Sequence, residues 1–177
     1  MDVKVELLEE LNSKDLCDLC DATESTIIDT HGFSIGFNKW SPPLRHEIES
    51  YFKGVMLIQE KKLFVGRING TIAGSIQLSI PHPSNQTSNF AASIDNHFVA
   101  PWARNIKLAK TLLTAAEDYA RANNFLLIKL SVRENREAAI ALYEKCNYKR
   151  WGYLSKYEFN GSNIVGGYFY EKSLEEI

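Results

Sequence analysis

Residues 99–113 read VAPWARNIKLAKTLL and join a strand-like stretch to an amphipathic helix through a proline turn and a polar turn that begins at Arg104. Backbone N–H groups of the turn and of the first helical turn have no intrahelical partner, and the helix dipole places positive partial charge beside them. The segment therefore predicts an anion site, of the kind that holds phosphates, at the carboxyl end of a strand. An ordinary strand-to-helix connection with solvated basic side chains is the alternative, and the downstream sequence argues against it.

The downstream sequence predicts another strand over the apolar residues 125–132 and then a short helix. Asn135 is a natural N-cap for this helix, because its side-chain oxygen accepts from a backbone N–H two or three residues on. Glu137 suits the positive end of the helix dipole, and Asn147 is an acceptable left-handed stop. The pattern places Tyr143 in the last turn of the helix.

Together the two segments resemble the GCN5-related N-acetyltransferase (GNAT) superfamily, and the similarity extends over most of the chain. The acetyl-CoA motif of that family reads Arg/Gln-x-x-Gly-x-Gly/Ala, and a later motif reads Asn-x-x-Ala-x-x-Leu-Tyr-x-x-x-Gly-Phe/Tyr. The residues of this chain that match the two motifs are Arg104, Ala109, Asn135, Ala138, Leu142, Tyr143 and Tyr148.

Two positions depart from the motifs. Lys107 stands where the family has the first Gly, and Asn147 stands where the second motif has Gly. Glycine is used in phosphate turns because a bare Cα lets the backbone approach the ligand and tolerates positive φ. We expect the Lys107 ammonium to offset the loss by pairing with a phosphate. Asn147 is a milder change, since Asn visits the left-handed region more readily than most residues.

The resemblance also implies where acetyl-CoA binds. A kink between the fourth and fifth strands of the family presents main-chain polar groups to the pantetheine arm and the thioester carbonyl, which corresponds to Phe98 and Val99 here. Asn135 is expected to contact the pantetheine arm. The implied cofactor contacts are Phe98, Val99, Arg104, Asn105, Ile106, Lys107, Leu108, Ala109, Asn135, Ala138 and Tyr143.

Acetyl transfer to an amine needs a neutral amine, a polarised thioester carbonyl and a protonated leaving thiolate. Tyr143 matches the family tyrosine that donates a proton to the thiolate, and a phenol with a reference pKa near ~10 is protonated at neutral pH. The base is Asp95 or His97, which share a face if their strand is regular. A structural role for His97 is the alternative. Glu60, His82 and Tyr157 are further candidates that sequence does not rank.

The remaining pattern predicts the rest of the fold. Apolar and polar side chains alternate over residues 3–7, which predicts a first strand. Ser13 offers an N-cap for a first helix that ends near residue 28. A second helix is expected over about residues 44–52. Asn69-Gly70 predicts a hairpin between strands 63–68 and 71–80, followed by a strand over 91–99. Strands that turn at Asn160-Gly161 close the chain. We predict one domain over residues 1–177, a mixed α/β fold with a mostly antiparallel sheet of about seven strands and helices on both faces.

The segment 30–43 is rich in turn-forming residues and also carries Phe33, Phe37 and Trp40. We expect the aromatic side chains of this loop to pack against the rest of the protein. It is either a cover over the core or one wall of the acceptor pocket, and the sequence leaves both open.

Composition excludes several classes of protein. With 45% hydrophobic and 24% charged residues and a net charge of −2, the 177 residues show no nucleic-acid or membrane bias. No apolar run reaches the ~18 residues of a spanning helix, and no cleavable signal begins the chain, so we expect a cytoplasmic location. Cys17 and Cys20 read as small hydrophobes on a helix, and we expect no metal and no disulfide scaffold.

The sequence therefore favours an acetyl-CoA-dependent N-acetyltransferase that acts on the primary amine of a small molecule by direct attack in a ternary complex. We expect a monomer or homodimer with no nucleic-acid or membrane partner. Two alternatives stay open. One is a catalytically degenerate acyl-CoA-binding regulatory domain, motivated by Lys107 in the phosphate turn. The other is a helix-turn interaction module that binds no nucleotide.

Overall fold

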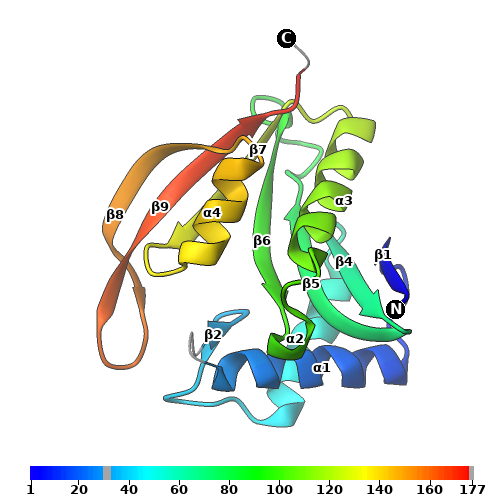
Figure 1. Cartoon of the computed structure of the whole chain (residues 1–177). Helices are drawn as coiled ribbons and strands as arrows, with labels where there is room; N and C mark the ends of the chain where they lie inside the picture. The colour runs from blue at the N-terminus through cyan, green and yellow to red at the C-terminus, as the bar shows by residue number, and fades with distance from the viewer. Residues whose placement is uncertain (30–32, 176–177) are drawn as a thin grey trace.

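The computed structural model describes residues 1–29 and 33–175, which form a seven-stranded sheet in the order β1-β4-β5-β6-β7-β9-β8 (Figure 1). Only β6 and β7 pair in parallel, and the other neighbours pair antiparallel. The strands are β1 (Val3–Leu7), β4 (Lys61–Ile68), β5 (Thr71–Ser79), β6 (Ala91–Val99), β7 (Leu127–Arg133), β8 (Lys149–Phe159) and β9 (Ile164–Ser173). The mixed, mostly antiparallel sheet is the one that the sequence predicts.

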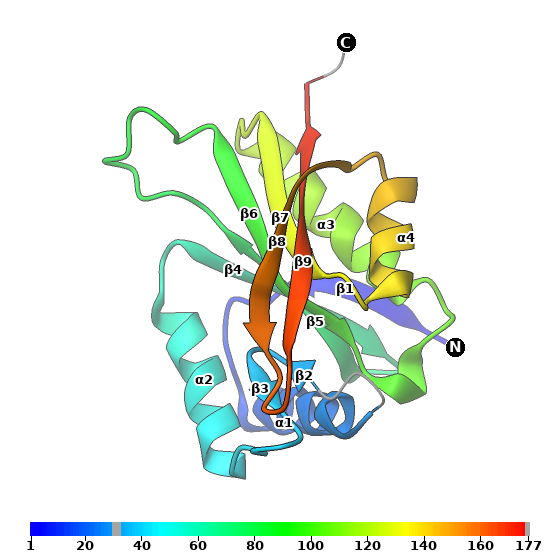
Figure 2. The ribbon, with the colours of Figure 1, turned by 90° about the vertical axis from the view of Figure 1, so that its left-hand side faces the viewer.

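Helices cover both faces of the sheet, as predicted (Figure 2). Alternation along β4 shows the two faces: Phe64 packs with α3 and α4, whereas Leu63 and Val65 pack with α1 and α2. A short hairpin, β2 (Phe33–Ser34) with β3 (Phe37–Asn38), stands apart from the main sheet. The helices are α1 (Ser13–Ile28), α2 (Arg45–Leu57), α3 (Leu108–Ala122) and α4 (Glu137–Lys145), with a 3-10 turn η1 (Pro101–Ala103) before α3.

Some predicted boundaries are wrong at the helix starts. The first N-cap is Asn12, not Ser13, because the Asn12 side chain accepts from the backbone N–H of Asp15 at 2.9 Å. The N-cap of α4 is Arg136, one residue beyond Asn135, and no side chain caps this helix. Both predictions misplace the first helical residue, which local pattern defines poorly.

Two other boundaries differ at element ends. Helix α2 runs from Arg45 to Leu57 because Val55 continues its buried face beyond Phe52. Strand β7 begins at Leu127, two residues after the predicted start, since the Phe125 N–H still bonds to the last turn of α3. Residues 30–32 of the predicted loop lie outside the described residues. The rest of that loop carries β2 and β3.

The hairpin prediction at Asn69-Gly70 is confirmed. Both residues have positive φ, 48° and 84°, as a type I′ turn requires. Among the described residues, no helix is long and apolar enough to span a membrane.

The divergence of β6 from β7 shapes the centre of the sheet. Their pairing covers only three positions and ends at Ser93 and Lys129. Between the pairs Gln77–Asp95 and Ser75–Phe98, one residue of β5 faces two of β6, which is a β-bulge. Asn96 lies in this bulge with φ 48°. The two strands therefore separate towards their carboxyl ends and leave a wedge in the sheet.

A buried ion pair ties α1 to the sheet. The Arg67 guanidinium contacts both oxygens of Asp15, at 2.6 and 3.0 Å, and also binds Glu6 at 2.7 Å. The Asp15 side chain is 5% exposed. The hydrogen bond from Arg67 lowers the pKa of Asp15 below its ordinary value of 3.8.

We predict that Arg67→Met destabilises the protein by roughly 3 kcal/mol at pH 7, because it leaves the Asp15 carboxylate buried without its cation. The Asp15 pKa is depressed in the wild type, so the pair stabilises above 3.8 and the stabilisation is lost as the pH falls through the lower native pKa. Urea unfolding at several pH values should show that the free energies of unfolding of wild type and variant differ most at neutral pH. If the difference in the free energy of unfolding does not become smaller below pH 3.8, the stabilising role of the Arg67–Asp15 pair is contradicted.

Candidate active site

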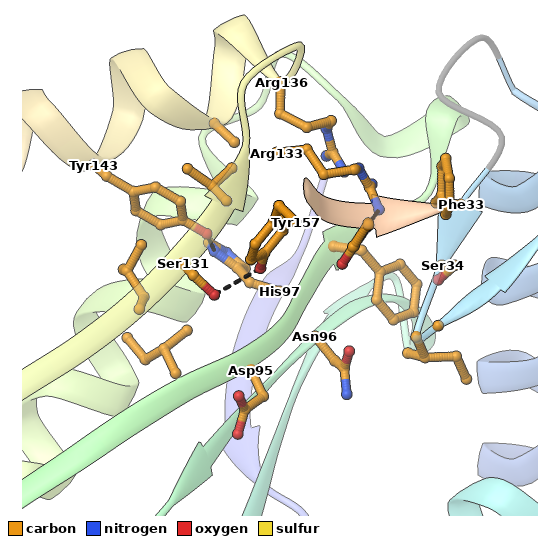
Figure 3. A pocket seen from close by; sticks show the side chains of 18 of the residues that line it. Phe33, Ser34, Asp95, Asn96, His97, Ser131, Arg133, Arg136, Tyr143 and Tyr157 are labelled. Carbon is orange, nitrogen blue, oxygen red and sulfur yellow. Dashed lines mark hydrogen bonds and ion pairs between the residues drawn. The ribbon is translucent and has the colours of Figure 1, made fainter. Parts of the chain in front are cut away.

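A cavity of about 430 Å³ occupies the wedge between β6 and β7 (Figure 3). Its walls come from β6 and β7, from the Phe33–Gly36 segment, from α4 and from β8. Tyr143, His97 and Asp95 all line it, and Tyr157 does as well. The segment around Phe33 is thus a wall of this cavity as well as a packed loop.

The bulge in β6 places Asp95 and His97 on opposite faces, so the expectation that they share one is wrong. Gln77, the cross-strand partner of Asp95, bonds to Tyr51 of α2, and so does Asn96. His97 instead contacts α3 and α4. An extra residue at Asn96 reverses the alternation of side chains, because a strand has a period of two.

His97 joins three elements through two hydrogen bonds. One ring nitrogen, Nε2, lies 2.9 Å from the carbonyl of Ala109, and the other, Nδ1, lies 3.0 Å from the Tyr143 hydroxyl. A carbonyl only accepts, so Nε2 carries the proton and the Tyr143 hydroxyl donates to Nδ1. Burial lowers the pKa of His97 to about 4 and raises that of Tyr143 above its ordinary value of 10. Both groups are neutral at pH 7.

Asp95 lies at the other side of the cavity and is more exposed. Its carboxylate accepts from the Ser79 hydroxyl at 2.5 Å, and the Lys61 ammonium lies 3.7 Å away. The side chain is 42% exposed, which leaves room for a proton acceptor to meet water or a substrate. Asp95 is therefore the accessible member of the predicted pair.

The further base candidates are arranged differently. Tyr157 lines the cavity, with its hydroxyl 2.6 Å from that of Ser131. His82 and Glu60 face each other at 3.9 Å, outside the residues that line the cavity. The structure brings only Tyr157 to the cavity.

The predicted phosphate turn has the backbone of a glycine-rich turn without its glycines. Asn105 and Lys107 both have φ 65°, and Lys107 is the N-cap of α3. The first helical residue, Leu108, packs so closely on Gly66 that a Cβ there would lie 2.6 Å from Leu108 Cδ1. The turn is thus held against the sheet, with a left-handed residue at its helix boundary.

The side chains of the turn have separate environments. The Arg104 guanidinium contacts Asp29 at the end of α1, at 2.6 Å. Ile106 packs against the main core. The Ala109 carbonyl accepts from His97.

The residues of β6 that were predicted to contact acetyl-CoA lie on opposite faces of the sheet. Phe98 is buried with Ala22 on the α1 face, whereas Val99 packs on the α3 face. Asn135, which precedes α4, and Ala138 on α4 are exposed, whereas Tyr143 on α4 is 6% exposed. Asn147 ends this helix with φ 68°, as expected from its place in the motif.

Several residues that line the cavity were missed from the sequence, among them Arg133, Arg136 and Ser34. Arg133 and Arg136 flank the start of α4, and Ser34 lies on β2. Arg133 and Arg136 lie close to Asn135 in the sequence, and this position beside the motif was the signal that could have identified them. No sequence pattern marks Ser34.

The interpretation of Cys17 and Cys20 as buried small hydrophobes on a helix is confirmed for Cys20 and wrong for Cys17. Cys17 is exposed and Cys20 is buried, and burial raises the pKa of Cys20 to about 11, which keeps it a thiol. Among the residues that the structure describes, no group of three or more His, Cys, Asp or Glu side chains is placed to hold a metal ion.

Known proteins share both the sequence and the fold. An N-acetyltransferase from Azospirillum brasilense, encoded in the hisH-hisA intergenic region and described as uncharacterized, is 44% identical over 136 residues, 76% of this chain and 78% of that protein. The crystal structure of an N-acetyltransferase from Staphylococcus aureus Mu50 matches with a TM-score of 0.77 at 20% identity, covering 99% of this chain and 100% of that one. The Salmonella typhimurium protein yncA, solved with its cofactor acetyl-CoA, matches with a TM-score of 0.74 at 12% identity, covering 99% and 95%.

The model of the acetyltransferase (GNAT) family matches residues 28–148, which include the turn before α3, the wedge and Tyr143. Tyr157 and Glu158 of β8, which also line the cavity, lie beyond the matched residues. The chain belongs to the GNAT acetyltransferase family.

Proposed function

We propose that the protein transfers the acetyl group of acetyl-CoA to the primary amine of a small molecule, by direct attack while both are bound. The observation that carries this proposal is the wedge between β6 and β7, with the Tyr143 hydroxyl held at its inner wall by His97. Family membership supports the acyltransferase chemistry, and a structural neighbour solved with acetyl-CoA supports the co-substrate.

The chain offers a continuous path for acetyl-CoA. Backbone N–H groups of the turn 104–107 and the start of α3 would hold the pyrophosphate. The wedge would hold the pantetheine arm between β6 and β7, where Phe98 and Val99 still pair with β5 and no longer pair with β7. Asn135 and Ala138 of the second motif would lie beside the arm. When bound, acetyl-CoA supplies the acetyl group as a reactive thioester.

Tyr143 is suited to act as the acid. Burial keeps its phenol protonated, and its hydroxyl is fixed in direction by His97. As negative charge develops on the departing sulfur, the hydroxyl turns from Nδ1 of His97 and donates there. Both ring nitrogens of His97 are engaged, Nε2 with the Ala109 carbonyl and Nδ1 with the Tyr143 hydroxyl, so His97 positions Tyr143 and leaves the proton of the amine to another group.

Asp95 is the base that the geometry favours. The acceptor enters as an ammonium ion, which must lose a proton before its nitrogen can attack. The Asp95 carboxylate is exposed to the cavity, where it takes this proton directly or through one water. Ser79 orients the carboxylate through its hydroxyl.

A second candidate function is a catalytically degenerate acyl-CoA-binding domain. It is favoured by one observation, the left-handed lysine in the phosphate turn. Calorimetric titration with acetyl-CoA, followed by an assay of CoA release with an amine panel, separates the two. Binding without turnover on any amine would favour the degenerate domain.

We predict that Tyr143→Phe lowers kcat about 100-fold while acetyl-CoA affinity changes little, because the ring stays and the proton donor is lost. Steady-state kinetics and calorimetry measure the two effects. Tyr119→Phe is the matched control, since that ring packs on Phe64 away from the cavity. An unchanged kcat would leave Tyr143 a packing residue.

A separate prediction concerns the base. Asp95→Asn should lower kcat/KM and remove the acid limb of its pH profile, because an amide takes up no proton. Asp118→Asn, an exposed position on α3, is the control. If the variant keeps the wild-type profile, the amine loses its proton elsewhere.

Lys107→Gly tests the phosphate turn. Relief of a left-handed lysine, worth roughly 1 kcal/mol, is partly offset by the freedom of glycine in the unfolded chain, so stability should rise by less than about 1 kcal/mol. If the Lys107 ammonium pairs with a phosphate, the variant should bind acetyl-CoA with similar or weaker affinity than the wild type. Its affinity should also depend less on salt concentration. Urea unfolding and calorimetry at several salt concentrations provide the measurements. Clearly tighter binding by the variant would show that the lysine blocks the turn.

A further inference from the structure

One cation in the cavity has no counter-ion. The guanidinium groups of Arg104 and Arg133 each contact a carboxylate, Asp29 at 2.6 Å and Glu158 at 2.7 Å. The Arg136 guanidinium has no hydrogen bond or ion pair with any residue that the structure describes, although it lines the cavity. Burial lowers the pKa of Arg136, and the nearby Arg133 cation lowers it further. A desolvated cation of this kind gains strongly from an anion beside it.

A buried hydroxyl faces the same cavity without a partner. Ser34 on β2 is 5% exposed, and its Oγ makes no hydrogen bond in the described structure. A buried hydroxyl without a hydrogen bond is unfavourable, so it marks a place where a ligand oxygen is missing. Arg136 offers only donors, and the Ser34 hydroxyl can donate as well. Together they suit an anion with oxygen atoms.

The location of these groups favours the acceptor over the co-substrate phosphates. No residue of the turn 104–107 lines the cavity, so phosphates held there lie outside it. Figure 3 shows the ends of Arg136 and Arg133 next to each other on the side of Phe33 and Ser34, away from Asp95. An amine near Asp95 and an anion near Arg136 therefore fit one small molecule.

The local charge favours a carboxylate over a phosphate. Arg133 is already compensated by Glu158, which leaves one net positive charge at Arg136. Asp95 and Glu158 line the same cavity and would repel a second negative charge. A planar guanidinium also matches a carboxylate in shape, through two parallel hydrogen bonds.

We propose that the acceptor is an amino acid or a close analogue, whose carboxylate is bound by the Arg136 guanidinium and the Ser34 hydroxyl while its amine faces Asp95. This inference rests on the proposed function. It makes Arg136 a specificity-determining residue that distinguishes amino acids from simple amines.

The test compares matched acceptors that differ only in the carboxylate. A panel of amino acids is assayed beside the corresponding amino acid amides and decarboxylated amines, with acetyl-CoA and detection of released CoA. For the preferred side chain, the wild type should turn over the amino acid with a kcat/KM at least tenfold above those of its two analogues. Arg136→Met should reduce this preference to less than twofold and leave the KM for acetyl-CoA within twofold. Ser34→Ala should reduce the preference several-fold.

Controls keep the result interpretable. Arg121→Met, a surface change on α3, should leave the preference intact. Arg136→Met removes an uncompensated cation, so its Tm should be unchanged or higher, which shows that the variant folds. Equal turnover of amino acids and amides by the wild type would overturn the proposal. So would a rise in the KM for acetyl-CoA in Arg136→Met with the acceptor preference unchanged, because the cation would then serve the co-substrate.

A binding measurement separates this inference from the proposed function. If no amine is acetylated, the proposed function fails, and titration with N-acetylated amino acids and their amides decides the carboxylate site. Tighter binding of the acids, abolished in Arg136→Met, would support the site without catalysis. Binding of neither ligand, or of both equally, would overturn it.

Discussion

The separation of β6 from β7 is the constraint on which the rest of the site depends. A sheet normally pairs its strands along their length, yet this pair ends after Ser93 and Lys129. The bulge at Asn96 bends β6 and increases its twist, so the carboxyl ends of the two strands diverge. Backbone polar groups and side chains that would otherwise be buried in the ladder then face a cavity. Such an opening in the middle of an otherwise continuous sheet suits a thin, polar pantetheine arm.

The same bulge decides which side chains meet. It turns His97 towards α3 and α4, where its two nitrogens join the Ala109 carbonyl to the Tyr143 hydroxyl. The imidazole therefore links the strand, the helix after the phosphate turn and the helix of the second motif. Asp95 remains on the other face with Ser79 and Lys61. In the proposed mechanism, acid and base are separated by the strand, and each has its own environment, which is a common way to keep two proton-transfer groups distinct.

Charge in the cavity is arranged by elements far apart in sequence. Arg104 meets Asp29 from α1, and Arg133 meets Glu158 from β8 and stacks on Phe33 of β2 at 4.0 Å from its ring centre. The Arg133 pair fixes a wall of the cavity and compensates one of its two arginines, whereas the Arg104 pair lies outside the cavity. Among the described residues, the Arg136 guanidinium has no carboxylate partner, and it lines the same cavity as Ser34, whose hydroxyl makes no hydrogen bond there. In the proposed function, the wedge between β6 and β7 takes acetyl-CoA, and the end of the cavity with Arg136 and Ser34 takes the acceptor.

The sequence by itself determined the strand and helix order, the hairpin at Asn69-Gly70 and the left-handed end of α4 at Asn147, because these depend on periodicity and on the local preferences of Asn and Gly. It also identified the family, through short motifs at Arg104 and Asn135. The tertiary structure alone decided the face of His97, the exact caps at Asn12 and Arg136, and the placement of Arg136 and Ser34 in one cavity. A bulge shifts alternation by one residue without a reliable local signal, and contacts between distant segments depend on packing. Neither can be read from neighbours along the chain.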